Sequence, residues 1–123
     1  MKRTVLITGP NGNIGSMLVN GFDTSLGLAV PDAENILTTD WDRRLEGITH
    51  VIHLAARTDV DQSHIRPGKF MDSNLHGLKL IADACLKKGI KLFFPSTTST
   101  YGSHAKTVDE TCTELKAYSP YAE

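Results

Sequence analysis

The sequence contains few cysteines, no excess of charge of either sign and no long apolar run. Two cysteines occur among the 123 residues, and the distance between Cys85 and Cys112 in the sequence argues against a paired-cysteine metal knuckle or a dithiol redox motif. The formal net charge is -1, so the chain offers no general attraction to nucleic acid or to an anionic membrane. No segment approaches the roughly 20 apolar residues that span a bilayer. We therefore expect a cytoplasmic protein whose partner is a small molecule.

The histidines also lack the clustering that a metal ion needs. Five of them are scattered along the chain, and the two nearest in sequence, His50 and His53, would project from opposite faces of a strand. The sequence therefore predicts no metal site. It also contains no internal repeat and no low-complexity segment.

A glycine-rich stretch at residues 5–15 organises the chain. It predicts a short buried strand, a turn and a helix that begins near Asn13, which together open a nucleotide-binding βαβ unit. Gly9 allows the tight turn, Gly12 lacks the Cβ that would hold the backbone away from a pyrophosphate, and Gly15 lets the helix pack closely. The first gap between glycines is one residue longer than in the usual dinucleotide fingerprint, and no lysine follows the last glycine, so a P-loop is disfavoured.

The remaining chain alternates between apolar runs and helical patterns. This alternation predicts a single α/β domain over residues 1–123, with a parallel sheet and flanking helices. The expected helices are 13–22, one turn within 43–47, and a long amphipathic helix at 69–88 that stops at Gly89. Residues 57–68 are expected to be a surface loop or the entry to that helix. The expected later strands are 28–30, 35–39, 50–56 (buried on both faces) and 90–94. Because of Pro95, the last of these should end early or lie at an edge of the sheet.

Polar residues gather where these strands end. They are the glycine turn, Asp40, residues 55–57 and residues 96–98. Because ligands of parallel sheets bind at the carboxyl ends of the strands, these clusters are expected to form one site.

Five ordered motifs resemble the extended short-chain dehydrogenase/reductases, the family that includes the sugar-nucleotide epimerases and dehydratases. Residues 8–15 resemble the cofactor turn of that family, and residues 53–56, His-Leu-Ala-Ala, resemble its fourth-strand signature. Residues 74–77 resemble an asparagine-containing helix, and residues 96–102 resemble the serine/threonine segment that ends in Tyr-Gly. Residues 109–110 and 119–123 resemble the approach to the catalytic tyrosine. The resemblance implies a Rossmann-like fold that is incomplete in this chain.

The resemblance also implies an NAD site, with NADP as the other possibility. The residues that match cofactor-binding positions of the family are Gly9, Asn11, Gly12, Asn13, Ile14, Gly15, Asp40, Trp41, Leu54, Ala55, Ala56, Asn74 and Tyr121. Asp32 is the nearest candidate to bind the ribose hydroxyls, whereas Arg43 and Arg44 would suit a 2′-phosphate. For several of these residues a purely structural role stays open. Asp40 would then belong to a turn, Ala55 and Ala56 would pack within the sheet, and Asn74 would be a solvent-exposed residue of its helix.

In catalysis the resemblance implies that Tyr121 is the general acid/base and that Thr97 orients the reacting oxygen. The lysine that supports the tyrosine in the family comes four residues later, beyond Glu123, so we expect an N-terminal fragment with little turnover. In the structural alternative, the hydroxyl of Thr97 only forms a hydrogen bond with the backbone of its own loop, and Tyr121 belongs to a frayed chain end.

The implied function is an NAD(P)-dependent epimerase or dehydratase acting on a nucleotide sugar through hydride transfer, with a homodimer possible in the full-length form. The alternatives are a carbonyl reductase of the same family and a non-catalytic dinucleotide-binding module. An uncovered sheet edge predicts weak stability or self-association.

Overall fold

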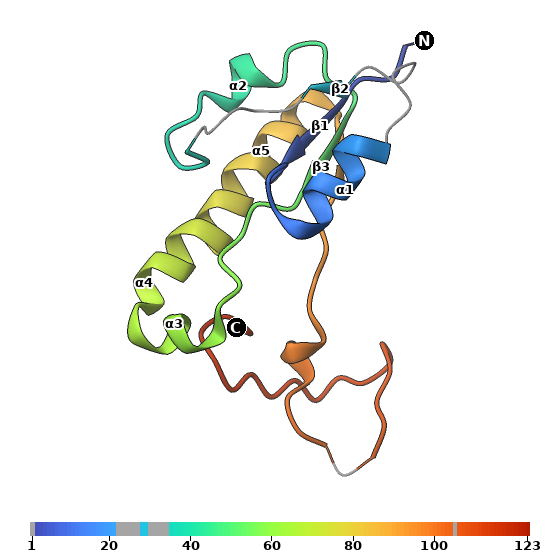
Figure 1. The fold of residues 1–123 in the computed structure, drawn as a ribbon. Helices are drawn as coiled ribbons and strands as arrows, with labels where there is room; N and C mark the ends of the chain where they lie inside the picture. The colour runs from blue at the N-terminus through green and yellow to red at the C-terminus, as the bar shows by residue number, and fades with distance from the viewer. Residues whose placement is uncertain (1, 22–27, 30–34, 105) are drawn as a thin grey trace.

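The computed structural model describes residues 2–21, 28–29, 35–104 and 106–123 (Figure 1). Its centre is a four-stranded sheet in the order β2-β1-β3-β4, and every neighbouring pair is parallel. The strands are β1 (Val5–Thr8), β2 (Leu28–Ala29), β3 (His50–His53) and β4 (Lys91–Phe93). The predicted parallel α/β sheet is confirmed. Because the strand order reverses between β1 and β3, the carboxyl ends of these two strands flank the switch point where such sheets bind ligands.

Helices lie on both faces of the sheet, although they cover one face only in part. α1 (Asn13–Gly21) follows the glycine turn on one face, and α2 (Trp41–Arg44) and α5 (Gly77–Lys88) lie on the other (Figure 1). α3 (Val60–Ile65), α4 (Pro67–Phe70) and the π-helical segment η2 (Met71–His76) lead into α5, and the 3₁₀ turn η3 (Thr98–Tyr101) follows β4. α5 ends at Gly89, which takes the left-handed conformation (φ 67°) expected of a helix-ending glycine.

The main core lies between the sheet and the α2/α5 layer. Leu6 and Val51 are register partners on β1 and β3 and are almost fully buried. The other buried members of this core cluster are Trp41, Leu45, Ile48, Ile81, Ala84 and Cys85. Packing against α5 therefore fixes the two central strands whose ends form the site.

The opposite face of β3 is only half covered. His50 and Ile52 point to that face and are half-buried, so the prediction of a strand buried on both faces is wrong in the described part of the chain. The predicted early end of the last strand is confirmed, since β4 stops at Phe93, before Pro95. The strand expected at 50–56 is shorter, since β3 ends at His53, and Val30 of the strand expected at 28–30 lies outside the described residues.

The predicted strand at residues 35–39 is wrong: this stretch is a turn. The side-chain oxygen of Asn35 accepts a hydrogen bond from Leu37 N–H at 2.9 Å, and its carbonyl accepts from Thr38 and Thr39 N–H at 3.1 and 3.0 Å. Asparagine bonding to nearby backbone in this way competes with strand pairing. The helical turn that follows begins at Trp41, two residues earlier than expected.

Residues 57–68, expected to be a surface loop or the entry to the long helix, contain α3 and the start of α4. The carboxylate of Asp59 caps α3 by accepting from Gln62 N–H at 3.0 Å, and Pro67 occupies the first turn of α4. Both are ordinary helix-starting signals. The long helix expected from residue 69 therefore starts at Pro67 and passes through the π-helical η2 before α5.

Candidate functional site

The glycine turn between β1 and α1 is built by close backbone packing. Gly9 has φ 69°, and a Cβ placed on it would lie 2.9 Å from the amide nitrogen of Ala55. A Cβ on Gly15 would collide with the carbonyl oxygen of Gly9. Gly12 differs: it is exposed, and a Cβ placed on it would make only an ordinary contact of 3.5 Å with the carbonyl oxygen of Gly9. This arrangement fits the expected roles: two glycines close the turn, and the third leaves room for a ligand.

The mouth of this turn is accessible. The predicted cofactor contacts Asn11, Gly12, Asn13 and Ile14 are exposed, whereas Gly15 is buried beneath them. Backbone N–H groups at the start of a helix favour a phosphate group because they carry the positive end of the helix dipole. The residues present therefore fit the pyrophosphate of a dinucleotide.

A buried hydrogen bond joins the ends of the two central strands. Thr8 Oγ1 lies 2.7 Å from His53 Nδ1, and both side chains are about 2% exposed. The same oxygen accepts from the N–H groups of Leu54 and Ala55, each at 3.1 Å. Its own hydrogen is then left for Nδ1, so the neutral imidazole of His53 carries its proton on Nε2. Burial lowers the pKa of His53 to about 4, which keeps the ring neutral near pH 7.

A cleft of about 280 Å³ opens beside this pair at the carboxyl edge of the sheet. It brings together six predicted site residues: Leu54, Ala55, Ala56, Asn74, Thr97 and Tyr121. His53, Phe70 and Phe94 also line it, and the rings of His53 and Phe94 stack with centroids 6.0 Å apart. Since Gly9 packs directly on Ala55, the cleft adjoins the glycine turn.

The two predicted catalytic residues reach the cleft from separate segments. Thr97 is half-buried; its hydroxyl accepts from Ser99 N–H at 3.2 Å and donates to Ser99 Oγ at 3.1 Å. Tyr121 lies in a turn anchored by buried Ser119, whose carbonyl accepts from Ala122 N–H at 2.9 Å. Thr97 thus forms a hydrogen bond with nearby backbone and also lines the cleft. The chain end that carries Tyr121 is packed, since Ala122 is buried.

Asn74 braces the loop that follows β3. Its carboxamide accepts from Arg57 N–H and donates to the Arg57 carbonyl, each at 2.8 Å. This side chain thus fixes the backbone next to Ala55 and Ala56 from across the cleft.

Asp40 and Trp41 do not line the cleft. Asp40 caps α2 by accepting from Arg43 N–H at 3.2 Å, and it borders a separate hollow with Arg43 and Arg44. The indole of Trp41 is 6% exposed and donates to the Ile36 carbonyl at 2.9 Å, so its ring belongs to the core. A contact of Trp41 with adenine would have to come from its backbone. The remaining candidate, Asp32, lies outside the described residues.

Three residues that support the site were not among the predicted site residues. Thr8 and His53 are one pair, and their signal in the sequence was their place at the ends of two apolar strands. Gly102 is the third: it has φ 66°, and a Cβ there would collide with the carbonyl oxygen of Lys116, so a side chain would push apart the two segments that carry Thr97 and Tyr121.

Neither a metal centre nor a membrane span is visible in the described part of the chain. No group of three histidine, cysteine, aspartate or glutamate side chains could hold a metal ion there. None of the described helices has the length and apolar character that crossing a bilayer requires.

A parallel sheet whose first strand ends in a glycine turn beside a cleft at the switch point defines a Rossmann-type nucleotide-binding domain. Residues 5–123 match the model of the NAD dependent epimerase/dehydratase family. The chain belongs to this family, which confirms the family predicted from the motifs, together with its NAD-type cofactor.

Individual relatives are nucleotide-sugar enzymes by name. The chain is 38% identical over 92 residues to the uncharacterized UDP-glucose epimerase YtcB of Bacillus subtilis, covering 72% of this chain and 28% of that protein. It is 37% identical over 84 residues to a dTDP-glucose 4,6-dehydratase of Streptomyces griseus, covering 65% of this chain and 25% of that protein. The matched region is thus about a quarter of each relative's length.

Solved structures share the fold. MoeE5 in complex with UDP-glucose and NAD superposes with a TM-score of 0.85 at 24% identity, covering 97% of this chain and 44% of that one. A dTDP-4-dehydrorhamnose reductase from Bacillus anthracis in complex with NADP gives 0.89 at 26% identity, covering 99% and 46%. The Rossmann-like fold is therefore confirmed over less than half of the length of these neighbours.

Proposed function

We propose that this chain forms the NAD-binding part of an epimerase or dehydratase that acts on a nucleotide sugar through hydride transfer. The observation that carries the proposal is the convergence of Thr97 and Tyr121 on the cleft beside Ala55 and Ala56, next to the glycine turn. The names of the relatives, UDP-glucose epimerase and dTDP-glucose dehydratase, support the substrate class.

In this proposal NAD, when bound, accepts and returns a hydride. The turn at Gly12 holds its pyrophosphate, and the small side chains of Ala55 and Ala56 let it pass close to the end of β3. Tyr121 exchanges a proton with a hydroxyl of the sugar, and Thr97 orients the reacting oxygen by a hydrogen bond. NAD is preferred to NADP here, and the homodimer and the contacts of Asp40 and Trp41 remain predictions.

The cofactor part is tested by calorimetric titration of the chain with NAD and with NADP, with circular dichroism as the check of folding. Gly12→Val should abolish saturable binding because its side chain would project into the exposed mouth of the turn, where the pyrophosphate is proposed to bind. Gly21→Val is the matched control, since Gly21 ends the same helix and has no atom near its virtual Cβ. Binding that persists in folded Gly12→Val would contradict the proposal.

The catalytic part is tested in a full-length protein that contains this chain. Tyr121→Phe should preserve cofactor binding and remove turnover of UDP-glucose or dTDP-glucose, because it deletes only the phenolic proton donor. Retained turnover in Tyr121→Phe would contradict the proposed role of Tyr121 as general acid/base.

A reductase is the second candidate function, because the dTDP-4-dehydrorhamnose reductase has the same fold as this chain and is 26% identical to it in sequence. Net oxidation of NADH or NADPH during turnover would favour it, whereas an epimerase regenerates its cofactor.

A further inference from the structure

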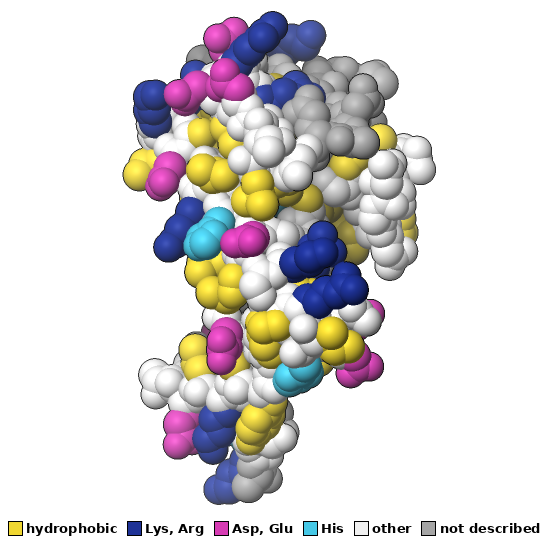
Figure 2. Space-filling view, turned by 90° about the vertical axis from the view of Figure 1, so that its left-hand side faces the viewer, with side chains coloured by type: hydrophobic (Ala, Val, Ile, Leu, Met, Phe, Trp, Pro, Cys, Tyr) yellow, Lys and Arg dark blue, Asp and Glu magenta, His cyan; other side chains and the backbone are white. Residues whose placement is uncertain are grey.

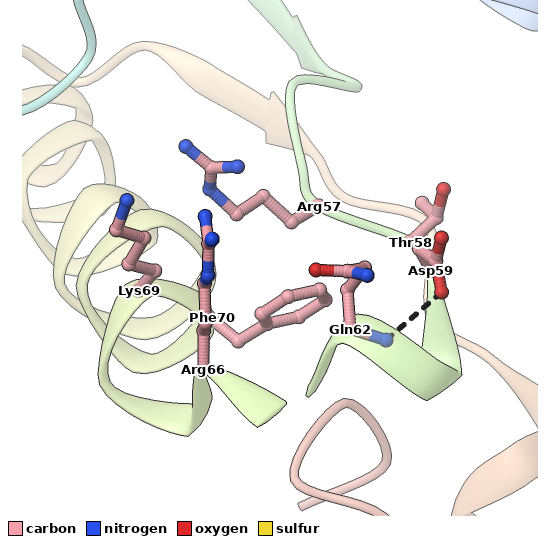
Figure 3. Close-up of a pocket in the computed structure, with 7 residues that line it drawn as sticks. All are labelled: Arg57, Thr58, Asp59, Gln62, Arg66, Lys69 and Phe70. Atoms are coloured by element: carbon pink, nitrogen blue, oxygen red, sulfur yellow. Dashed lines mark hydrogen bonds between the residues drawn. The ribbon is translucent and has the colours of Figure 1, made fainter. Parts of the chain in front are cut away.

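A second pocket lies beside the cleft and is lined by basic side chains (Figure 3). This basic pocket, of about 230 Å³, is formed by Arg57, Thr58, Asp59, Gln62, Arg66, Lys69 and Phe70. The residues come from the loop after β3, from α3, from the α3–α4 junction and from α4. Phe70 also lines the cleft, so the two hollows share one wall. None of the predicted cofactor or catalytic residues lines the basic pocket.

The backbone that carries these cations is fixed. The backbone N–H and the backbone carbonyl of Arg57 are both hydrogen-bonded to the carboxamide of Asn74. Arg66 N–H donates to the Gln62 carbonyl at 2.9 Å, and the Arg66 carbonyl accepts from Lys69 N–H at 3.1 Å. Phe70 is 4% exposed and forms a rigid wall. The backbone of the basic pocket therefore has a defined shape, and the exposed side chains of Arg57, Arg66 and Lys69 extend from it.

The charges in the pocket are unbalanced. Arg57, Arg66 and Lys69 extend along the same side of it (Figure 3), and Asp59 is its one acidic residue. The carboxylate of Asp59 is engaged as the cap of α3. Within the described residues, the recorded salt bridges involve none of the three cations. The pocket thus contains three positive side chains and one negative side chain, an imbalance that favours an anion carrying more than one negative charge.

We propose that the basic pocket binds a phosphate group. Two guanidinium groups offer planar pairs of N–H donors that match phosphate oxygens, and the lysine adds a point charge. This site goes beyond the proposed function, because the glycine turn holds the dinucleotide independently. The phosphate is either a free ion or ester, or the diphosphate of a nucleotide sugar that reaches over Phe70.

The test uses inorganic phosphate as the probe, titrated into the chain at low ionic strength and followed by calorimetry. We expect saturable binding of one phosphate per chain. The Arg66→Gln/Lys69→Gln double variant should weaken it about tenfold or more, because charge-assisted donors are lost. The matched control is Lys79→Gln/Lys88→Gln, which removes the same charge from α5 outside the pocket. No saturable binding, or an equal loss in both double variants, would overturn the site.

Two further variants separate the site from its surroundings. Arg57→Lys keeps the charge but loses the planar donor pair, so it should weaken phosphate binding while leaving the circular-dichroism spectrum unchanged. Gly12→Val should leave phosphate binding intact even though it blocks NAD, so the two proposals fail independently. Competition by UDP-glucose for bound phosphate would assign the pocket to the substrate's diphosphate, and lack of competition would assign it to a separate phosphate ligand.

Discussion

Thr8 and His53 face each other across β1 and β3 and form a buried hydrogen bond of 2.7 Å between Oγ1 and Nδ1. Because Thr8 Oγ1 also accepts from the first two N–H groups after β3, this one hydroxyl ties together both central strands at the edge where the cleft begins. Burial keeps the imidazole of His53 neutral, and the hydrogen bond with Thr8 fixes its tautomer, with Nε2–H as the remaining donor.

The burial of His53 predicts a pH dependence of stability. The pKa of His53 falls from 6.5 to about 4 on folding, so the unfolded state binds more protons between these values. The free energy of unfolding should therefore rise from pH 4 to pH 6.5 and lose this dependence above it, by at most about 3 kcal/mol. Urea unfolding at a series of pH values measures it. The exposed His64→Gln variant should keep the dependence and His53→Gln should reduce it; equal slopes would contradict the assignment.

Removing the hydroxyl of Thr8 should destabilise the fold. Thr8→Val conserves shape but leaves the N–H groups of Leu54 and Ala55 and the Nδ1 atom of His53 without this partner, at a cost of about 2–4 kcal/mol. Thr8→Ser retains the hydroxyl and should lose much less. Urea denaturation measures both. The interpretation fails where serine and valine destabilise equally, because loss of the methyl contact would then dominate.

Gly15 and Gly12 should respond differently to alanine. A Cβ on Gly15 meets the Gly9 carbonyl, so Gly15→Ala should cost about 2–3 kcal/mol of stability through strain. Gly12→Ala meets nothing closer than 3.5 Å and should change stability by less than about 1 kcal/mol. Thermal unfolding of both variants beside Gly21→Ala tests this. Equal losses at Gly12 and Gly15 would contradict the packing described for the turn.

The parts of the fold that the sequence predicted are those that local chemistry dictates. The glycine turn, the helix stop at Gly89 and the strand stop before Pro95 each depend on the conformation of one or two residues. The clustering of polar residues at strand ends followed from parallel topology, which brought Thr97, Tyr121 and Ala55 into one cleft.

The predictions failed or stayed incomplete where local hydrogen-bonding signals competed with the hydrophobic pattern, and where burial determined the role of a side chain. Asn35 turned an apolar stretch into a turn, and Asp59 and Pro67 started helices within a polar segment that resembled a loop. The ring of Trp41, a residue predicted to contact the cofactor, completes the core, because the face that an aromatic ring takes depends on α5, distant in sequence. Its contact with the cofactor stays a prediction. The role of His53 depended on a partner on another strand, which spacing alone does not reveal.

The uncovered side of the sheet should drive self-association of this chain. Among the described strands β4 is an edge, and Phe93 is 60% exposed beside an apolar hollow that includes Leu18 and Ile52. Hydrophobic side chains are also exposed between charged ones on the side that carries α2 and α5 (Figure 2). An open strand edge next to apolar surface favours pairing with a second copy.

Phe93→Lys should reduce this association, because it places a charge at both the edge and the hollow. The matched control is Leu115→Lys, since Leu115 is 63% exposed but lies in the segment after η3 rather than in the sheet. Sedimentation velocity over a concentration series should show a shift towards monomer for Phe93→Lys alone. Equal behaviour of the two variants would mean that general surface hydrophobicity, and not the β4 edge, drives association; a wild-type chain that is monomeric at every concentration would show that this edge does not recruit a second copy.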